Sequence, residues 1–459
     1  MRLLPFISRR YLAVIAVALA LIMSVLDGTI VNVALPTLSR EFGISPSSTI
    51  WVVNAYQLTV TMLLLSFSAL GDIYGYRRIF LFGTGLFTAT SLLCALSGSF
   101  PMLVIARIAQ GIGAAAIMGV TTALMRIIFP PEHIGRGMSI NAMVVAVSIA
   151  AGPSIAGLIL SFASWHWLFA INLPLGVCAI TAGYLLLPEN PSRQTPIRRK
   201  FDKLGGVCSA LTFGLLIYSL EGIAHDENRW LVLIQLLLLL AIGTFFIRRE
   251  RHEETPILPL DLLRIPIFAL SVIASIASFT AQMLAMIALP FFLQNIAGRS
   301  EVETGLLMTP WPVATVLTAP IAGRLVERFH PGILGGIGMA LYSLGLLLLV
   351  FLPSEPTNCE LAWRLAICGI GFGLFQTPNN STMMSAAPAY RSGGANGMQG
   401  TARLLGQTTG TTLVALIFRL IHGTNPLPTC LTLAIGFAVV AGITSVCRLS
   451  QPTPIRKRH

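Results

Sequence analysis

The stretch MSVLDGTIVNVALP (23–36) decides how the chain is interpreted, because it places a carboxylate, Asp27, inside a long apolar run. The run from about 11 to 35 carries no other charged residue, and roughly 20 mostly apolar residues suffice to cross a bilayer. A charge at such depth costs between about 2.5 and more than about 10 kcal/mol, depending on the scale. Asp27 is therefore expected to be protonated, paired, or facing a water-filled cavity.

The composition of the 459 residues indicates a membrane protein with many spans. Hydrophobic residues make up 55%, charged residues 10%, and the mean hydropathy is +0.79, whereas about a quarter of a soluble protein is charged. The net charge of +12 lies in short basic clusters between apolar runs, which is typical of membrane orientation rather than nucleic-acid binding. The seven cysteines show no metal-binding spacing, so we expect no metal site and no nucleic-acid partner.

The apolar runs predict an all-α polytopic protein with fourteen membrane-spanning helices. Basic stretches at 188–203 and 248–264 divide them into two six-helix bundles and a two-helix insert. The predicted units are 1–188, 189–264, 265–449 and a tail at 450–459. The predicted spans are 11–35, 50–71, 79–98, 101–128, 137–163, 166–187, 204–222, 229–247, 267–296, 303–325, 332–352, 361–386, 394–420 and 429–448.

The distribution of basic residues predicts the orientation of these spans. Of the 30 Lys and Arg residues, 23 fall at the termini and in the loops after even-numbered spans, and five fall in the other loops. Because cytoplasmic loops are enriched in Lys and Arg, we expect a multi-pass protein of the inner (plasma) membrane with both termini cytoplasmic. The first apolar run is too long for a cleaved signal peptide.

A partner for Asp27 is available in RIAQGIGAAA (107–116) of the fourth span. Counted at 1.5 Å per residue, Asp27 lies roughly 13 Å and Arg107 roughly 9 Å from the outer end of their helices. They could pair directly or through Gln110. Burial disfavours the charged form of a carboxyl group, so that it can load and release a proton. We therefore predict proton coupling at Asp27 and Arg107; a purely structural ion pair is the alternative.

The fifth span contains SIAAGPSIAG (148–157), in which small residues recur at every fourth position and a proline interrupts the helix. This pattern predicts a hinge between the two halves at Gly152, Pro153 and Gly157. An ordinary packing face is the alternative.

The second half offers soft apolar side chains and one deep cation, Arg403, with Gln399 and Gln407 one turn to either side. The run GIGFGLFQTPNN (369–380) has the Gly and Pro content of cavity-lining backbone. Methionine and aromatic side chains suit a wide pocket for flat apolar groups, although they are also common in cores. The predicted substrate-binding residues are Asp27, Asn32, Gln57, Gln110, Met283, Met286, Phe291, Trp311, Phe375 and Gln376.

Two turns resemble each other across the halves, SALGDIYGYRR (68–78) and GRLVERFHPG (323–332). Both carry an acid followed by arginine, with Glu327 in the place of Asp72. Matching turns indicate duplication, as in transporters built from two related bundles; two unrelated charged turns are the alternative. The predicted gating residues are Asp72, Gly75, Arg77, Arg78, Glu327 and Arg328.

Five motifs together resemble the fourteen-helix drug:proton antiporter group of the major facilitator superfamily. Ser68, Ser148, Ala156 and His166 depart from the usual residues of these motifs. The motifs are LDGTIVNVALP (26–36), GDIYGYRR (71–78), RIAQGIGAA (107–115), SIAAGPSIAG (148–157) and WHWLFAINLPLG (165–176).

The resemblance implies alternating access by two rocking bundles, a loop motif that latches the outward-facing state, and proton-coupled export. The group's substrates include quaternary ammonium biocides, dyes and methyl viologen. Some relatives carry an extra acid in the tenth span, but here Glu301 and Glu303 lie only at its outer edge. The partners expected are protons, lipid and small lipophilic or cationic substrates, for a monomer.

Other functions stay open at this point. The chain has no P-loop, no H-E-x-x-H motif and no long soluble segment, so we expect neither an enzyme nor a cofactor. A transporter of one metabolite or nutrient is the first alternative, because the fold does not fix the substrate. A membrane scaffold or sensor that transports nothing is the second.

Overall fold

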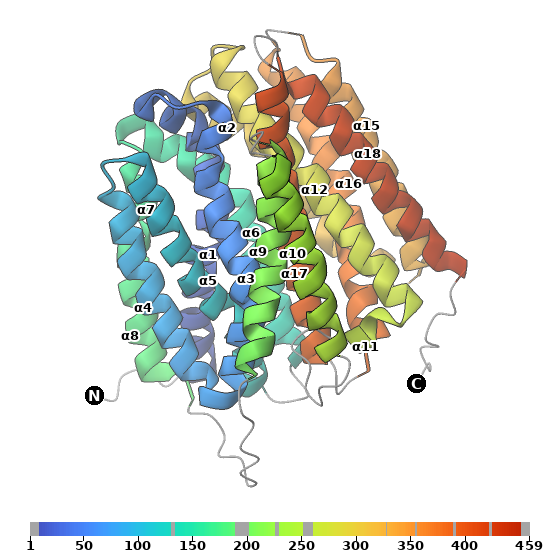
Figure 1. Cartoon of the computed structure of the whole chain (residues 1–459). Coiled ribbons are helices and arrows are strands. Elements are labelled where there is room, and N and C mark those ends of the chain that lie inside the picture. Colours follow the sequence, from blue (N-terminus) through green and yellow to red (C-terminus); the bar gives the residue numbers. More distant parts are fainter. Residues whose placement is uncertain are drawn as a thin grey trace.

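The computed structural model describes residues 9–129, 134–188, 202–224, 229–250, 260–326, 328–353, 356–388, 392–421 and 425–450. Every regular element in these ranges is a helix, and they contain no strand. Most helices run roughly parallel along one direction and form two groups side by side (Figure 1).

The helices follow the predicted spans closely. The first half contains α1 (Arg9–Phe42), α2 (Pro46–Thr49), α3 (Trp51–Tyr74), α4 (Tyr76–Ala95), α5 (Phe100–Ile128), α6 (Ile134–Phe162), α7 (His166–Ala170) and α8 (Asn172–Leu186). A hairpin follows, made of α9 (Lys203–Ala224) and α10 (Arg229–Glu250). The second half contains α11 (Leu260–Leu263), α12 (Pro266–Asn295), α13 (Glu301–Met308), α14 (Pro310–Leu325), α15 (Pro331–Val350), α16 (Asn358–Ala386), α17 (Ser392–Leu420) and α18 (Leu427–Cys447).

Within the described ranges, eleven helices or helix pairs are long and apolar enough to cross a membrane. Of the fourteen predicted spans, those at α9, α16 and α17 are not among the eleven. The apolar stretch counted in α9 covers only 204–216, and polar residues interrupt the apolar runs of α16 and α17. The protein is thus an all-helical membrane protein, and the number fourteen stays a prediction.

The two halves are packed as separate groups of helices. In the first half α5 packs against α3 and α4, and α1 packs against α6 and α8. In the second half α16 packs against α14 and α15, and α18 against α12 and α15. The α9–α10 hairpin lies in front of both halves in Figure 1, with α9 against α3 and α17. The predicted boundaries near 189 and 264 stay predictions, because 189–201 and 251–259 lie outside the described ranges.

The halves are in contact along α3 and α17, and they are also joined at the end where α1 finishes and α13 begins, which we call the closed end. There Arg40 forms an ion pair with Glu301 at 3.1 Å, and Thr37 donates a hydrogen bond to the same carboxylate at 3.0 Å. The amide of Gln294 donates to the carbonyl of Val33 at 2.9 Å. We call the opposite end, where α1 begins and α18 finishes, the termini end (Figure 1).

Candidate functional site

Asp27 lies in a buried polar cluster built by four helices of the first half, α1, α3, α5 and α8. Its side chain is fully buried and forms an ion pair with Arg107 of α5. The other carboxylate oxygen, Oδ1, accepts hydrogen bonds from Gln110 Nε2 at 3.0 Å and from Asn172 Nδ2 at 2.9 Å. Both oxygens thus face donors, which is the arrangement that stabilises an ionised carboxylate. The predicted pairing of Asp27 with Arg107 and Gln110 is present in the structure.

Arg107 is held in place by its remaining neighbours. Its Nε donates to the carbonyl of Val52 at 2.9 Å, and its Nη1 donates to Gln110 Oε1 at 2.6 Å. The guanidinium carbon lies 4.3 Å from the ring centre of Tyr56 on α3, a cation–π contact. Nη2 is buried and has no hydrogen-bond partner in the described ranges. This unused donor leaves Arg107 able to bind a further acceptor if the cluster rearranges.

Burial makes this ion pair sensitive to changes in charge. Removing one partner of a buried pair costs about 3–5 kcal/mol, because the other charge is left uncompensated. A proton on Asp27 removes its negative charge and has the same effect on Arg107. Protonation of one buried carboxyl group can therefore change the relative stability of two arrangements of the surrounding helices.

Two members of the cluster were not predicted. Asn172 is the first residue of α8, directly after the break at Ile171 that separates α7 from α8. Tyr56 lies on α3, and its hydroxyl donates to the carbonyl of Ser24 at 2.6 Å. An asparagine inside the apolar run AINLPLG was the available signal for Asn172. No periodicity reveals that α8 turns this side chain toward α1.

The other polar residues predicted for the substrate site fall in two places. Gln110 belongs to the Asp27 cluster, whereas Gln57 lies at the contact between halves, where it accepts a hydrogen bond from Thr411 at 3.3 Å. Asn32 is buried, and its Oδ1 has no partner among the described residues. Gln376 on α16 is half-buried.

The apolar residues predicted for a pocket pack within the second half. Trp311 and Phe375 are almost completely buried, and the Trp311 ring lies 5.5 Å from that of Tyr342. Met283 and Phe291 are buried on α12, and Met286 packs against the same core. In this conformation these side chains form the core of the second half, so their contact with substrate stays a prediction.

The predicted hinge residues lie where α6 crosses α13. A Cβ atom added to Gly305 would lie 2.4 Å from the carbonyl oxygen of Pro153 and 2.9 Å from the Cα of Gly157. Backbones therefore touch here because both positions lack a side chain. Gly152 is packed as closely against Thr29 of α1. The hinge role of these residues stays a prediction.

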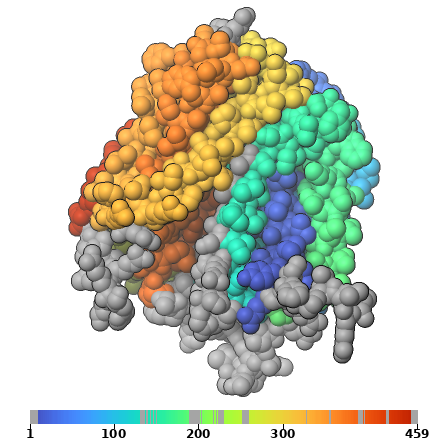
Figure 2. Space-filling view, turned by 180° about the vertical axis from the view of Figure 1, so that it is seen from behind, coloured from blue at the N-terminus to red at the C-terminus, as the bar shows by residue number. Residues whose placement is uncertain are grey.

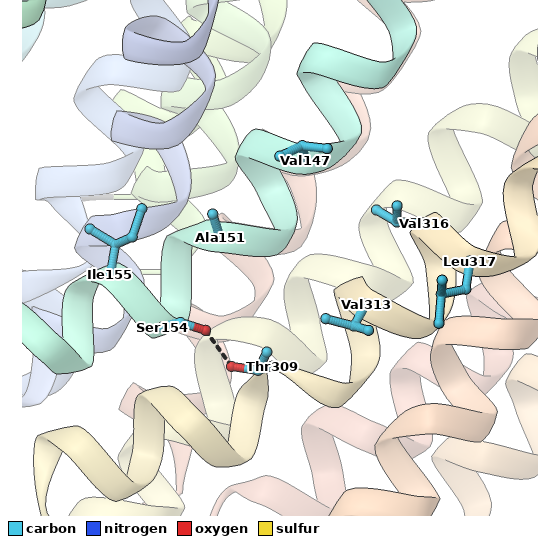
Figure 3. A pocket seen from close by; sticks show the side chains of 8 residues that line it. All are labelled: Val147, Ala151, Ser154, Ile155, Thr309, Val313, Val316 and Leu317. Atoms are coloured by element: carbon cyan, nitrogen blue, oxygen red, sulfur yellow. Dashed lines mark hydrogen bonds between the residues drawn. The ribbon is translucent and has the colours of Figure 1, made fainter.

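From this crossing toward the termini end, α6 and α14 separate, and a pocket of about 390 Å³ lies between them. Figure 3 shows Ser154 and Thr309 in contact at its narrow end, with their hydroxyl oxygens 2.5 Å apart. Figure 2 shows the two elements, in teal and in yellow to light orange, diverging from the closed end downward. The lining is almost wholly apolar: Val147, Ala151, Ser154, Ile155, Thr309, Val313, Val316 and Leu317.

The turn between α3 and α4 contains the motif GDIYGYRR (71–78), and its backbone takes a conformation that needs glycine at position 75. Gly75 has φ 103°, which only glycine adopts readily. Tyr76 donates a hydrogen bond to Asp72, and Arg77 donates to the carbonyl of Tyr184 on α8. Arg78 and Arg328 are exposed, and Glu327 lies outside the described ranges. The gating role of these residues stays a prediction.

Comparison with known proteins identifies the family. The family described as Major Facilitator Superfamily matches residues 17–411. The "Uncharacterized transporter YebQ" of Escherichia coli is 51% identical over 97% of both chains. The "Multidrug resistance protein Stp" of Mycobacterium tuberculosis is 32% identical over 87% of this chain and 74% of its own. The "Riboflavin transporter RibZ" of Clostridioides difficile is 30% identical over 90% and 89%.

Solved structures agree at the level of the fold. A bacterial homologue of the human lysosomal transporter Spinster, in an inward-facing and occupied conformation, has a TM-score of 0.68 at 13% identity and covers 98% of this chain and 100% of its own. These matches and the apolar helices describe a multi-pass membrane transporter, not an enzyme. The chain belongs to the Major Facilitator Superfamily.

Proposed function

We propose that this transporter exports small lipophilic molecules in exchange for protons, with Asp27 as the residue that carries the proton. The supporting observation is the buried cluster in which Asp27 pairs with Arg107 and accepts two amide hydrogen bonds. Among the described residues of the two six-helix blocks, every other Asp or Glu lies in a loop or near a helix end. If coupling needs a deep carboxyl group, Asp27 is the candidate.

We further propose that the termini end faces the cytoplasm of the inner membrane and the closed end faces outward. The excess of basic residues at the termini and in the loops after even-numbered spans supports this orientation. The structure then corresponds to an inward-open state: the halves are joined on the outer side and α6 separates from α14 on the inner side.

The apolar pocket between α6 and α14 supports a lipophilic substrate. Its lining has almost no polar surface, and the side chains that form it lie within two candidate membrane-spanning segments from different halves. A compound dissolved in the inner leaflet can reach the space between the halves through this opening without first crossing water. Alternating access then releases it on the outer side.

The cycle uses the two charge states of Asp27. In the inward-open state Asp27 is ionised and paired with Arg107, and the substrate binds. After the halves rock and the substrate leaves, a proton from the outside neutralises Asp27 and releases Arg107. The protonated form returns inward and loses its proton to the cytoplasm. A neutral substrate exchanged for one proton would use the membrane potential as well, at about 2.3 kcal/mol per charge per 100 mV.

The relatives favour efflux. Stp is named a multidrug resistance protein, and "Multidrug efflux pump LfrA" of Mycolicibacterium smegmatis is 28% identical over 91% of this chain and 82% of its own. The similarity to RibZ supports the second candidate, transport of one metabolite. Quaternary ammonium compounds, expected from the resemblance to the fourteen-helix group, would have to displace Arg107 in order to pair with Asp27.

The test is export by the Asp27→Asn variant. Everted membrane vesicles with an imposed pH gradient accumulate a transported fluorescent dye when the wild type is present, and we expect Asp27→Asn to lose accumulation. Glu41→Gln is the matched control, because Glu41 is an exposed acid on the same helix. Normal accumulation by Asp27→Asn would refute the proposal.

A further inference from the structure

Arg403 lies on α17 at the contact between the halves. Gly400, one turn before it, faces Leu64 of α3, and Leu404, directly after it, packs in the core of the first half. Two turns further on, Thr411 hydrogen-bonds Gln57 of α3. Eight residues separate Arg403 from Thr411, so Arg403 lies roughly 12 Å closer to the termini end.

The Arg403 side chain has no protein acceptor among the described residues. It is half-buried, and its Nε is inaccessible to solvent and unpaired. It lies near enough to Tyr56, which covers Arg107, for the two side chains to interact electrostatically.

Among the described residues, the two fully buried arginines have acceptors, unlike half-buried Arg403 and Arg364. Arg107 has Asp27 as its counter-ion. Arg448, at the end of α18, donates to Ser271 at 3.1 Å, to Asn379 at 2.8 Å and to both oxygens of Ser445. Burying an unpaired charge is unfavourable. The Arg403 guanidinium lies at the contact between halves without an acceptor among the described residues, so packing alone does not explain why an arginine is present there.

The charge balance at this contact is positive. Asp27 is already neutralised by Arg107, and Arg403 adds a cation without a matching acid among the described residues of the surrounding helices. A cationic substrate placed near Arg403 is repelled, whereas an anionic group restores electroneutrality. The planar guanidinium presents parallel N–H donors that match a carboxylate, sulfonate or phenolate.

We propose that Arg403 is a substrate-binding residue that receives the acidic group of lipophilic organic anions. This inference rests on the proposed export function and specifies the charge of its substrates. The pocket between α6 and α14 provides apolar surface between the same two halves for the body of such a molecule. Export of one anion together with import of one proton carries two net positive charges inward, so an inside-negative membrane potential would drive the exchange.

The experiment compares two dyes that share a xanthene ring, fluorescein as the anion and rhodamine 6G as the cation. Binding to the solubilised full-length protein is measured at pH 7.5 by fluorescence anisotropy, and transport is measured in proteoliposomes with an imposed pH gradient. We expect the wild type to bind and export fluorescein. Arg403→Gln is expected to raise the dissociation constant for fluorescein at least about tenfold, because a charge-assisted contact is lost.

Three variants make the result specific to the charge at Arg403. Arg403→Lys keeps the charge and is expected to retain most of the fluorescein affinity. Arg324→Gln removes an exposed arginine at the end of α14 and is expected to leave binding unchanged. Thermal unfolding of each variant confirms that Arg403→Gln is folded, and for Arg403→Gln the affinity for rhodamine 6G is expected to be unchanged or higher.

Other results would overturn the inference. Equal losses for both dyes in Arg403→Gln would mean that the residue supports structure only. Export of rhodamine 6G by a wild type that does not bind fluorescein would refute the anion site and leave the export function intact. A wild type that binds fluorescein but moves neither dye under the pH gradient would contradict the proposed function and not the anion site.

Discussion

At the scale of single residues, the Asp27 cluster is organised around one carboxylate that accepts three hydrogen bonds. Arg107 provides the opposite charge, and Gln110 and Asn172 provide neutral donors to the second oxygen. Hydrogen bonds to charged groups contribute about 1.5–3 kcal/mol each. Because Asn172 donates to Asp27 Oδ1, its contribution to the charged form can be separated by changing Asp27.

A double-mutant cycle tests this contribution. Asn172→Ala is expected to lower the unfolding free energy by about 1–3 kcal/mol, because a buried carboxylate loses a donor. In the Asp27→Asn background the same change is expected to cost clearly less, since no charge remains to be stabilised. The measurement is reversible unfolding in mild detergent. Equal costs in both backgrounds would show that Asn172 acts independently of Asp27.

At the scale of elements, the crossing of α6 and α13 depends on the absence of side chains at Gly157 and Gly305. A Cβ at position 305 would lie within 2.4 Å of a backbone oxygen that cannot move without shifting α6. Gly305→Val is therefore expected to weaken the closed end and to speed maleimide labelling of a cysteine introduced at Val33, in a background without the native cysteines. Gly436→Val is the matched control, because nothing lies within 4 Å of a Cβ there. Unchanged labelling in Gly305→Val would contradict a role of this crossing in keeping the closed end shut.

The α9–α10 hairpin is fastened at the termini end by an ion pair. Partial burial favours a higher pKa for Asp202, but hydrogen bonds from Arg249 at 3.0 and 3.2 Å and from the Gly205 amide at 2.9 Å outweigh it and hold the pKa below its ordinary value. A carboxyl group whose pKa is lower in the folded state stabilises the fold above its unfolded pKa of about 3.9. This stabilisation is lost as the pH falls through the folded pKa.

The sign of this effect gives a prediction. Asp202→Asn is expected to lower the melting temperature relative to the wild type at pH 7, and the difference is expected to shrink as the pH falls below about 4. Arg249→Gln is expected to lower the melting temperature at pH 7 as well, and combining it with Asp202→Asn to add little. A difference between wild type and Asp202→Asn that grows toward low pH would contradict this account.

Sequence alone predicted where the helices lie, because apolar length is a strong signal, and it predicted the pair of Asp27 and Arg107 from their depth. It did not predict the breaks at Ile171 and Thr309, which turn one apolar run into two helices. It could not place Trp311, since packing and not composition decides whether an aromatic side chain lines a cavity. The partners of Asp27 on α3 and α8 depend on helix rotation, which apolar periodicity does not fix in a membrane.

At the scale of the whole molecule, the halves touch at the closed end and along α3 and α17, whereas α6 and α14 diverge toward the termini end. The contact of Ser154 with Thr309 marks the point where they part. The hairpin covers the opposite side, where α9 packs against α3 and α17. Alternating access therefore requires the contacts at the closed end to break while those near the pocket form.

A cross-link tests this motion. The Ser154→Cys, Thr309→Cys pair, in a background without the native cysteines, is expected to form a disulfide because the two native oxygens are 2.5 Å apart. The oxidised protein is expected to lose transport and to regain it on reduction, since α6 and α14 can no longer separate at this point. Either cysteine alone is expected to be insensitive to oxidation. Full transport by the cross-linked protein would show that the halves move about another contact.

The central claim is that Asp27 carries the coupled proton, and proton flux in proteoliposomes tests it most directly. With a pH-sensitive dye inside the liposomes, addition of a transported substrate is expected to accelerate dissipation of an imposed pH gradient by the wild type. For Asp27→Asn we expect substrate to equilibrate down its own gradient with no added proton flux. Substrate-dependent proton flux at the wild-type rate in Asp27→Asn would contradict the claim.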